Sequence, residues 1–194
     1  LCDPLDSLHC VPKWNDMQYF CMKHTPSGNS AFQNDTCVYC NASNQPAKLI
    51  YCIQCGFTLP RPHKKIMQWK CSHCSRTNDS ATLKCESCGE QFEDQPLFAG
   101  VRLIRAFHTA YRRMRKNCPA STLTTNSGVI SSDVKGHPTQ NRVLSVREVL
   151  IASSLDTAKD YGWKTNALRE VEKCGHTVIR HIAGESIPPL MSHK

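Results

Sequence analysis

The sequence predicts several small modules without a single large core: zinc-stabilised β-hairpin fingers, a basic α-helix, an extended linker and a small α/β tail. The 194 residues include 13 cysteines, and eight of these form four Cys-x2-Cys pairs between residues 37 and 88. Aromatic residues make up only 7% of the chain, which limits the size of any core. The formal net charge of +8 lies in the second half, where residues 96–194 carry 15 Lys+Arg against 7 Asp+Glu.

The N-terminal segment, residues 1–36, is a candidate third zinc site. It contains cysteines and histidines among Pro, Asn and Ser, without a sustained hydrophobic period. The candidate ligands are Cys2, Cys10, Cys21 and His24. His9 competes with Cys10 for its role. The alternative is that these side chains are ordinary members of a loop-rich segment.

The four Cys-x2-Cys pairs predict two closed zinc sites. Each pair places two thiolates on one side of a tight turn, and two pairs complete the tetrahedron that Zn²⁺ prefers. We expect finger 1 at residues 37–58 and finger 2 at residues 67–92. The expected ligands are Cys37, Cys40, Cys52 and Cys55 in finger 1, and Cys71, Cys74, Cys85 and Cys88 in finger 2. Such pairs chelate metal better than they bridge distant partners, which indicates a reducing compartment.

A cross-braced arrangement is the alternative to two sequential sites. In it, the 37/40 pair shares a metal with 71/74, and 52/55 shares one with 85/88. Ubiquitin-ligase RING domains are built this way, but they use an internal Cys-x-His step that this chain lacks. We therefore expect sequential sites.

Finger 2 fits a longer pattern, W-x-C-x2-C-x3-N-x6-C-x2-C, in which Trp69 and Asn78 fill the two positions that are not cysteine. It resembles the Ran-binding-protein type zinc fingers (the zf-RanBP or NZF family). The resemblance implies two crossed β-hairpins around the metal, with Trp69 packed on the finger and Asn78 tying its loops together. Finger 1 looks like a variant copy, with Asp35 at the Trp position and one more residue in its central loop.

Members of the resembled family bind single-stranded RNA or ubiquitin through short signatures that this chain lacks. The RNA signature has an aromatic residue after the Asn and arginines soon after it, whereas this chain has Asp79, Ala81 and Thr82. The ubiquitin signature is Thr-Phe after the second cysteine, whereas this chain has Ser75-Arg76. The fingers are therefore expected to be structural. Cations around them could still touch phosphates without reading sequence: Arg61, His63, Lys64, Lys65, Lys70 and Arg76.

Residues 96–118 are expected to form a basic amphipathic helix. Its apolar residues recur at helical spacing: Ile104, Phe107, Tyr111 and Met114. Residues 101–117 contain six cations and no acid: Arg102, Arg105, Arg112, Arg113, Arg115 and Lys116. Arginine favours phosphate, so we expect these residues to bind RNA. The alternatives are a solvated basic face and attachment to a membrane surface.

The remainder is expected to be a Ser/Thr/Gly-rich extended linker at 119–142 and a small α/β tail at 143–194. Ser145-Val-Arg-Glu148 fits a capping box that would begin the first helix of the tail. The expected elements of the tail are a helix through Leu155, a second helix from about Thr165 to Cys174, and a strand from Thr177 to Ile182.

The motifs predict a protein that is not an enzyme. There is no G-x-S-x-G, no Gly-rich phosphate loop and no H-x-E paired with P-C-x-x-C, and a tetrathiolate site leaves no open position on its metal. The combination of modules looks like a zinc-binding subunit of a large ribonucleoprotein. We expect a mitochondrial ribosomal protein that contacts rRNA phosphates and neighbouring proteins. The alternatives are a free-standing adaptor for a protein such as ubiquitin and a single-stranded RNA-binding protein, in the cytoplasm or nucleus.

A membrane and a small-molecule substrate are not expected as partners. No apolar run approaches the roughly 20 residues that a membrane span needs. Two zinc ions are the expected cofactors, and the N-terminal set could hold a third.

Overall fold

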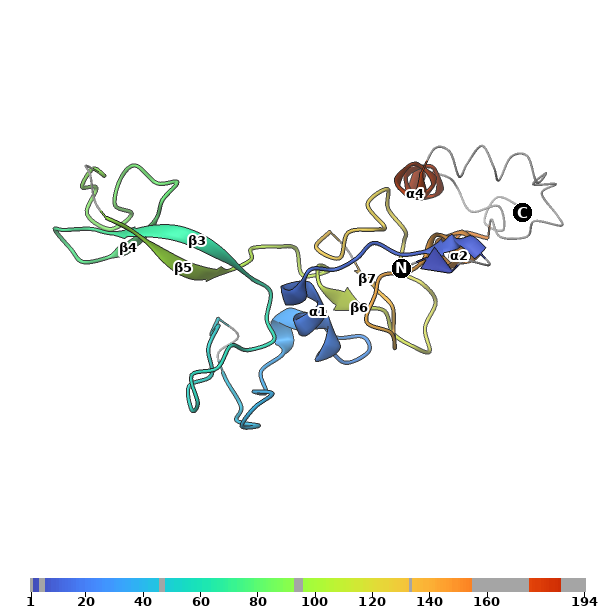
Figure 1. Ribbon diagram of the computed structural model, residues 1–194, viewed down its shortest axis with the longest axis horizontal. Coiled ribbons are helices and arrows are strands. Elements are labelled where there is room, and N and C mark those ends of the chain that lie inside the picture. Colours follow the sequence, from blue (N-terminus) through green and yellow to red (C-terminus); the bar gives the residue numbers. More distant parts are fainter. Residues whose placement is uncertain are drawn as a thin grey trace.

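The computed structural model describes residues 2–3, 6–45, 48–92, 96–132, 134–154 and 175–185. These residues form a small mixed α/β structure with three small sheets, three α-helices and two four-cysteine groups. The elements are β1 (Cys2–Asp3), β2 (Asp6–Cys10), α1 (Asp16–Lys23), the 3-10 helix η1 (Ala31–Gln33), β3 (His63–Lys70), β4 (Thr77–Asp79), β5 (Leu97–Leu103), β6 (Arg112–Arg113), β7 (Val134–Gly136), α2 (Val146–Ala152) and α4 (His176–Glu185). Figure 1 shows an elongated molecule with the β3–β5 ribbon at one end and α2 and α4 at the other.

The centre of the molecule is a core built from segments that are far apart in sequence. Backbone hydrogen bonds join Ala31 to Tyr111 and Tyr111 to Ile130, each at 2.8 Å. α1 packs on this core and begins with a capping box, in which Asn15 and Gln18 each accept a hydrogen bond from the other's backbone N–H. The buried members of the core are Cys21, Met22, Ala31, Ala110, Tyr111, Ile130 and Val143.

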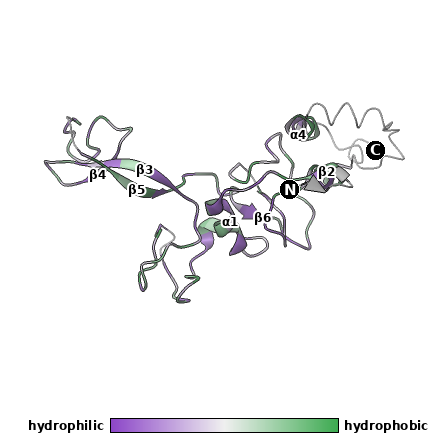
Figure 2. Ribbon diagram, in the orientation of Figure 1, coloured by the Kyte–Doolittle hydropathy of each residue, from purple (hydrophilic) through white to green (hydrophobic). Residues whose placement is uncertain are grey.

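The ribbon is an antiparallel sheet with the strand order β4-β3-β5. Seven residues of β3 pair with β5, from His63 opposite Leu103 to Trp69 opposite Leu97. Gly100 leaves the space in which the Gln68 side chain lies, because a Cβ on Gly100 would meet Gln68 Oε1 at 1.8 Å. Hydrophilic residues mark the start of β3, at the end of the ribbon nearest α1 (Figure 2).

A second core joins β2, α2 and α4. Its buried residues are Leu8, Met114, Leu144, Val146, Val149, Leu150, Ile179 and Ala183. Arg180 of α4 is also buried, and it donates hydrogen bonds to the carbonyl oxygens of Leu144 at 2.7 Å and Ser127 at 3.2 Å. The side chain of Arg180 therefore holds α4 against two loops of the body.

The predicted helix over residues 96–118 is wrong. The chain instead forms β5, a turn and β6 in this region. The apolar residues at helical spacing do not share a face, since Tyr111 and Met114 belong to different cores and Phe107 is 78% exposed. Pairing with β3 satisfies the backbone groups along one edge of β5.

The C-terminal half also differs from its predicted elements. The segment expected to be an extended linker contributes Ile130 to the central core and contains β7, which pairs in parallel with β6. The predicted strand over Thr177–Ile182 lies within α4, because Ile179 and Ala183, one helical turn apart, both face the core. α2 begins at the predicted capping box of Ser145. The predicted helix from Thr165 to Cys174 lies outside the described residues.

Among the described residues, no helix combines the length and the hydropathy that crossing a membrane would require.

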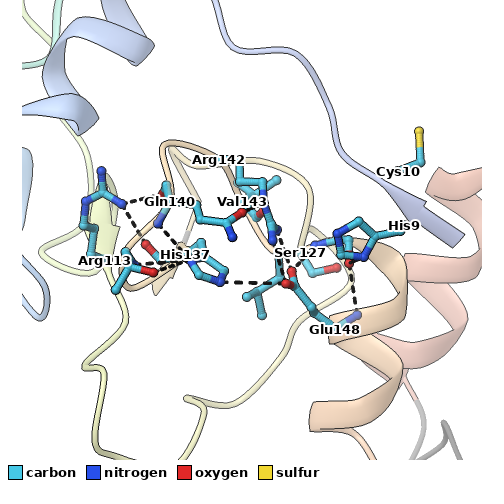
Figure 3. Close-up of polar contacts among 12 residues, drawn as sticks. His9, Cys10, Arg113, Ser127, His137, Gln140, Arg142, Val143 and Glu148 are labelled. Carbon is cyan, nitrogen blue, oxygen red and sulfur yellow. Dashed lines mark hydrogen bonds and ion pairs between the residues drawn. The ribbon is translucent and has the colours of Figure 1, made fainter. Parts of the chain in front are cut away.

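Glu148 closes the capping box of α2 and lies at the centre of a polar cluster (Figure 3). Its carboxylate accepts hydrogen bonds from the Ser145 backbone N–H at 2.7 Å and from both terminal nitrogens of Arg142 at 2.6 and 2.7 Å. His137 Nε2 lies 3.8 Å from the same carboxylate. Burial opposes ionisation of Glu148, but the hydrogen bonds and charge of Arg142 outweigh it and lower the pKa to about 2.

We expect Glu148→Gln to lower the free energy of unfolding at neutral pH by about 2–3 kcal/mol, because neutral glutamine cannot form the ion pair with Arg142. The ionised carboxylate stabilises the fold fully above its ordinary pKa of 4.5, and this contribution is lost as the pH falls toward 2. Denaturant unfolding of both proteins across this range measures the difference. Zinc release at low pH affects both proteins alike. A difference that did not shrink in acid would contradict the assignment.

Candidate metal centres and nucleic-acid interface

The eight cysteines of the fingers form two compact groups, one in each finger. In each group the ligand atoms all lie within 4.8 Å of one another. Facing sulfur atoms are 3.4–3.6 Å apart, from Cys37 to Cys55, Cys40 to Cys52, Cys71 to Cys88 and Cys74 to Cys85. Tetrahedral zinc, with zinc–sulfur bonds of about 2.3 Å, places sulfurs about 3.8 Å apart, whereas a disulfide holds them at about 2.05 Å. Each group could therefore hold one metal ion, and zinc suits the donor set.

The grouping is sequential rather than cross-braced. The 37/40 pair meets 52/55, and the 71/74 pair meets 85/88. All eight cysteines are free thiols. Hydrogen bonds from the backbone N–H groups of Cys88 and Ser87 lower the pKa of Cys85 to about 6, which prepares this thiol to bind as a thiolate.

A buried asparagine joins the two halves of each finger in the same way. In finger 1, Asn44 donates a hydrogen bond to the Ala42 carbonyl at 2.7 Å and accepts one from the Ile53 N–H at 2.8 Å. In finger 2, Asn78 donates to the Arg76 carbonyl and accepts from the Glu86 N–H, each at 3.1 Å. One side chain thus fixes the first cysteine turn relative to the second. The sequence signal was the Asn four residues after the second cysteine of each first pair.

The two fingers are attached differently to the rest of the chain. Finger 2 continues from β3 through Trp69, which is fully buried, packs on Phe92 at a ring distance of 5.1 Å and donates to the carbonyls of Asp79 and Thr82. Arg61, which is also fully buried, anchors finger 1. Its guanidinium donates to the carbonyl oxygens of Asn34, Leu49 and Asn44 at 2.7–2.8 Å. The expectation that Arg61 touches phosphates is therefore wrong.

The structure does not assemble the predicted N-terminal zinc site. Cys10 is disulfide-bonded, and Cys2 lies opposite it in the β1–β2 pair. Cys21 is fully buried beside Met17, and burial raises its pKa to about 12. The ring of His24 packs edge-on against Phe20. In the part of the chain that the structure describes, the two finger groups are the metal-ligand clusters found.

The six cations predicted to bind nucleic acid do not form one surface. Arg113 is only 3% exposed and donates to the carbonyl oxygens of Thr25, Met22, His137 and Gln140 and to the side chain of Asn141. Arg102 forms an ion pair with Asp79 at 2.6 Å. Arg112 is half-buried, while Arg105, Arg115 and Lys116 are exposed. Arg113 therefore supports the fold, and the exposed cations remain candidates for phosphate contact.

Two stretches of the chain combine exposed cations with an absence of acids. Residues 60–78 and 96–132 contain no Asp or Glu. Lys64 and Lys65 are exposed at the start of β3, and Lys70 is exposed at its end. β5 brings Arg102 directly opposite Lys64. The absence of acids was visible in the sequence, but the pairing of the two stretches depends on the fold.

Comparison with known proteins finds similarity to part of one enzyme. The chain is 30% identical over 115 residues to the Type II methyltransferase M1.HgaI of Avibacterium volantium. The alignment covers 55% of this chain and 30% of that protein, so the chain spans less than a third of the length of this relative. No family model matches, and no solved structure matches.

This similarity overturns the identity predicted from the motifs. The chain is similar to a methyltransferase, so the Ran-binding-protein finger assignment, the ribosomal subunit and its mitochondrial ribosome context are wrong. The prediction that the protein is not an enzyme is wrong for the same reason. Cysteine pairs at this spacing form a metal site through local geometry. Their presence therefore does not identify the family or the function of the protein that contains them.

Proposed function

We propose that this chain belongs to a protein related to DNA methyltransferases and provides part of its DNA-binding surface. The observation that carries the proposal is the 30% identity over 115 residues to a type II methyltransferase. The alignment covers 30% of that relative, so the proposal concerns one portion of such an activity. The proposed task of this portion is to hold the DNA that is methylated.

The charge distribution supports a polyanionic partner. The formal net charge is +8, and the two stretches that contain β3 and β5, residues 60–78 and 96–132, carry cations without acids. Lys64, Lys65, Arg105, Arg115 and Lys116 are exposed. Cations on such a surface bind by releasing the counterions that surround nucleic acid, so the affinity falls as salt rises.

The shape of the ribbon also supports DNA as the partner. The major groove admits a two-stranded β-ribbon. β3 pairs with β5 alone over residues 63–67, before β4 joins the sheet at Gln68, and this two-stranded part projects from the body (Figure 1). Finger 2 follows β3 directly, with Trp69 at the junction. A metal-stabilised finger at this position would keep the end of the ribbon rigid, which lowers the entropic cost of binding.

We expect replacement of Lys64, Lys65 and Arg105 by Gln to weaken binding to duplex DNA and to reduce the salt dependence. Loss of three phosphate contacts should make the slope of log affinity against log salt shallower by about 2–3. Fluorescence anisotropy with a labelled duplex at several salt concentrations measures this slope. The matched control is Gln at Lys13, Lys23 and Lys48, which are exposed outside the two acid-free stretches.

Two results would contradict the proposed function. One is the absence of duplex binding by the wild-type protein at low salt. The other is a clear preference for single-stranded RNA over duplex DNA of the same length, since the same phosphate chemistry could serve RNA. Equal losses from the test and control triplets would show that net charge alone determines the affinity.

A further inference from the structure

A cavity of about 430 Å³ lies between the end of β2, the loop over residues 125–129 and the start of α4. Its volume is in the range of sites that bind small ligands. Val11 and Val129 are among the apolar residues that line it. α4 approaches the loop closely, because a Cβ on Gly184 would meet the carbonyl carbon of Thr124 at 2.4 Å. Close backbone packing therefore fixes α4 against this loop.

Arg180 of α4 lines the cavity and is only 3% exposed. Its terminal nitrogens donate to carbonyl oxygens, but its Nε is buried and has no hydrogen-bond partner among the described residues. A Cβ on Gly128, which also lines the cavity, would lie 3.6 Å from this Nε. The unpartnered N–H of Arg180 therefore lies beside Gly128 at the cavity.

The guanidinium of Arg180 is a buried charge that forms no ion pair in the described part of the chain. Burial lowers the pKa of Arg180 to about 10, so the group is still charged at neutral pH. Glu148 raises this pKa, but its carboxylate already accepts hydrogen bonds from both terminal nitrogens of Arg142. None of the residues that line the cavity is acidic. An anion beside Nε would supply the missing countercharge.

The start of α4 supplies further groups that can donate to an anion. His176 is the first residue of this ten-residue helix, and it lines the cavity together with Thr177. The Nδ1 atom of His176 is buried and has no hydrogen-bond partner among the described residues. The first backbone N–H groups of a helix have no acceptor within the helix, and its dipole favours negative charge there. A guanidinium, an imidazole and a helix N-terminus therefore border one cavity.

We propose that this cavity binds a small aliphatic carboxylic acid as its anion. The carboxylate accepts hydrogen bonds from Arg180 and His176 at the start of α4, and the aliphatic body lies against Val11 and Val129. The single formal cation of the lining matches one negative charge better than the two charges of a phosphate. The lining offers no acid for an ammonium group, so an amino acid is not the expected ligand. The inference is independent of DNA binding, because none of the cations proposed for DNA lines this cavity.

Isothermal titration calorimetry of the full zinc-loaded chain with octanoate, at constant ionic strength, tests the proposal. We expect one octanoate per chain. Octanamide has the same length but no charge, so it should bind about tenfold more weakly or worse. 2-Aminooctanoate adds an ammonium group that the lining cannot pair, and it should be weakened to a similar extent. Inorganic phosphate should also bind more weakly than octanoate, because it cannot use the apolar walls.

Two variants locate the site. Gly128→Ala keeps every polar group and places a methyl group beside Arg180 Nε. The backbone of Gly128 is not left-handed, and the nearest contacts of the methyl group would be at 3.4 Å, so the fold should tolerate it. We expect octanoate affinity to fall by about 10- to 150-fold, as for loss of a hydrogen bond to a charged group. His176→Ala should have a similar effect. His181→Ala is the matched control, since His181 is exposed on the same helix and does not line the cavity.

Three results would overturn the proposal. The first is no binding of octanoate to the wild type at millimolar concentrations. The second is octanamide or 2-aminooctanoate binding as tightly as octanoate, which would exclude the proposed ligand class. The third is full octanoate affinity in both Gly128→Ala and His176→Ala, with circular dichroism showing that both are folded, which would place the ligand elsewhere. Duplex binding by the wild type is measured separately, so failure of the proposed function would be distinguished from each of these results.

Discussion

Replacing Cys85 by Ser is expected to unfold finger 2 and to reduce the bound zinc from two ions per chain to one. Serine oxygen is a poor zinc ligand, and structural zinc supplies about 10–16 kcal/mol of folding energy to fingers of this size. The two cysteine groups are separate, so finger 1 should keep its ion. Elemental analysis of the purified protein measures the stoichiometry, and circular dichroism reports the loss of ordered structure.

Cys118→Ser is the matched control for this experiment. Cys118 is an exposed free cysteine outside both groups, so its replacement should leave two zinc ions bound. Loss of both ions from the Cys85 variant would show that the fingers fold as one unit. Retention of both ions would remove Cys85 from the ligand set.

The loss of finger 2 should also affect the ribbon. Trp69 is a residue of β3, and it packs on Cys71, Cys85 and Phe92 of the finger. Without the metal, the Trp69 side chain loses these packing contacts at the end of β3. We therefore expect the Cys85 variant to bind duplex DNA more weakly than the wild type, although no cation has been removed.

The second large effect is expected from Arg113→Met, which should lower the free energy of unfolding by about 3–5 kcal/mol. The Arg113 guanidinium is the shared donor for four carbonyl oxygens and the Asn141 side chain. Methionine fills a similar volume but donates nothing, so these acceptors would be buried without partners. Thermal or urea unfolding measures the change.

Arg115→Met serves as the control, because Arg115 is exposed only two residues away. It should leave stability almost unchanged and weaken DNA binding slightly. An Arg113 variant that folded normally but failed to bind DNA would show that Arg113 contacts nucleic acid after all.

The metal groups could be predicted from the sequence because their geometry is local. Two residues between cysteines fix the turn, and Asn44 and Asn78 lie at constant distances from the first pairs. The capping box from Ser145 to Glu148 is local in the same sense. Elements of this kind are specified by a few neighbouring residues. They can therefore be recognised in the sequence whatever the surrounding fold is.

The region from 96 to 118 could not be predicted because its structure depends on distant partners. β5 forms through its pairing with β3, which lies some 30 residues earlier in the chain. Spacing alone cannot show that Tyr111 and Met114 enter two different cores, or that Phe107 enters neither. The same limit applies to cations, since Arg113 and Arg115 differ in burial but not in sequence character.

The polar cluster at Glu148 illustrates an intermediate case. Its capping role followed from the sequence, but the approach of Arg142 and His137 did not. The depressed pKa of Glu148 therefore arises from a loop whose path is set by β7 and the central core. Local rules gave the position of the carboxylate, and the contacts with Arg142 and His137 lowered its pKa.

Arg61 determines the direction in which finger 1 leaves the body. A guanidinium is planar, and its N–H groups point in fixed directions. One acceptor, Asn34, precedes finger 1, and the other two, Asn44 and Leu49, lie within it, so a single rigid group joins the finger to the segment before it. Rotation of the finger about its connections would break several of these hydrogen bonds together. Finger 1 is therefore a fixed extension of the body, and its heading is set by one side chain rather than by the length of a linker.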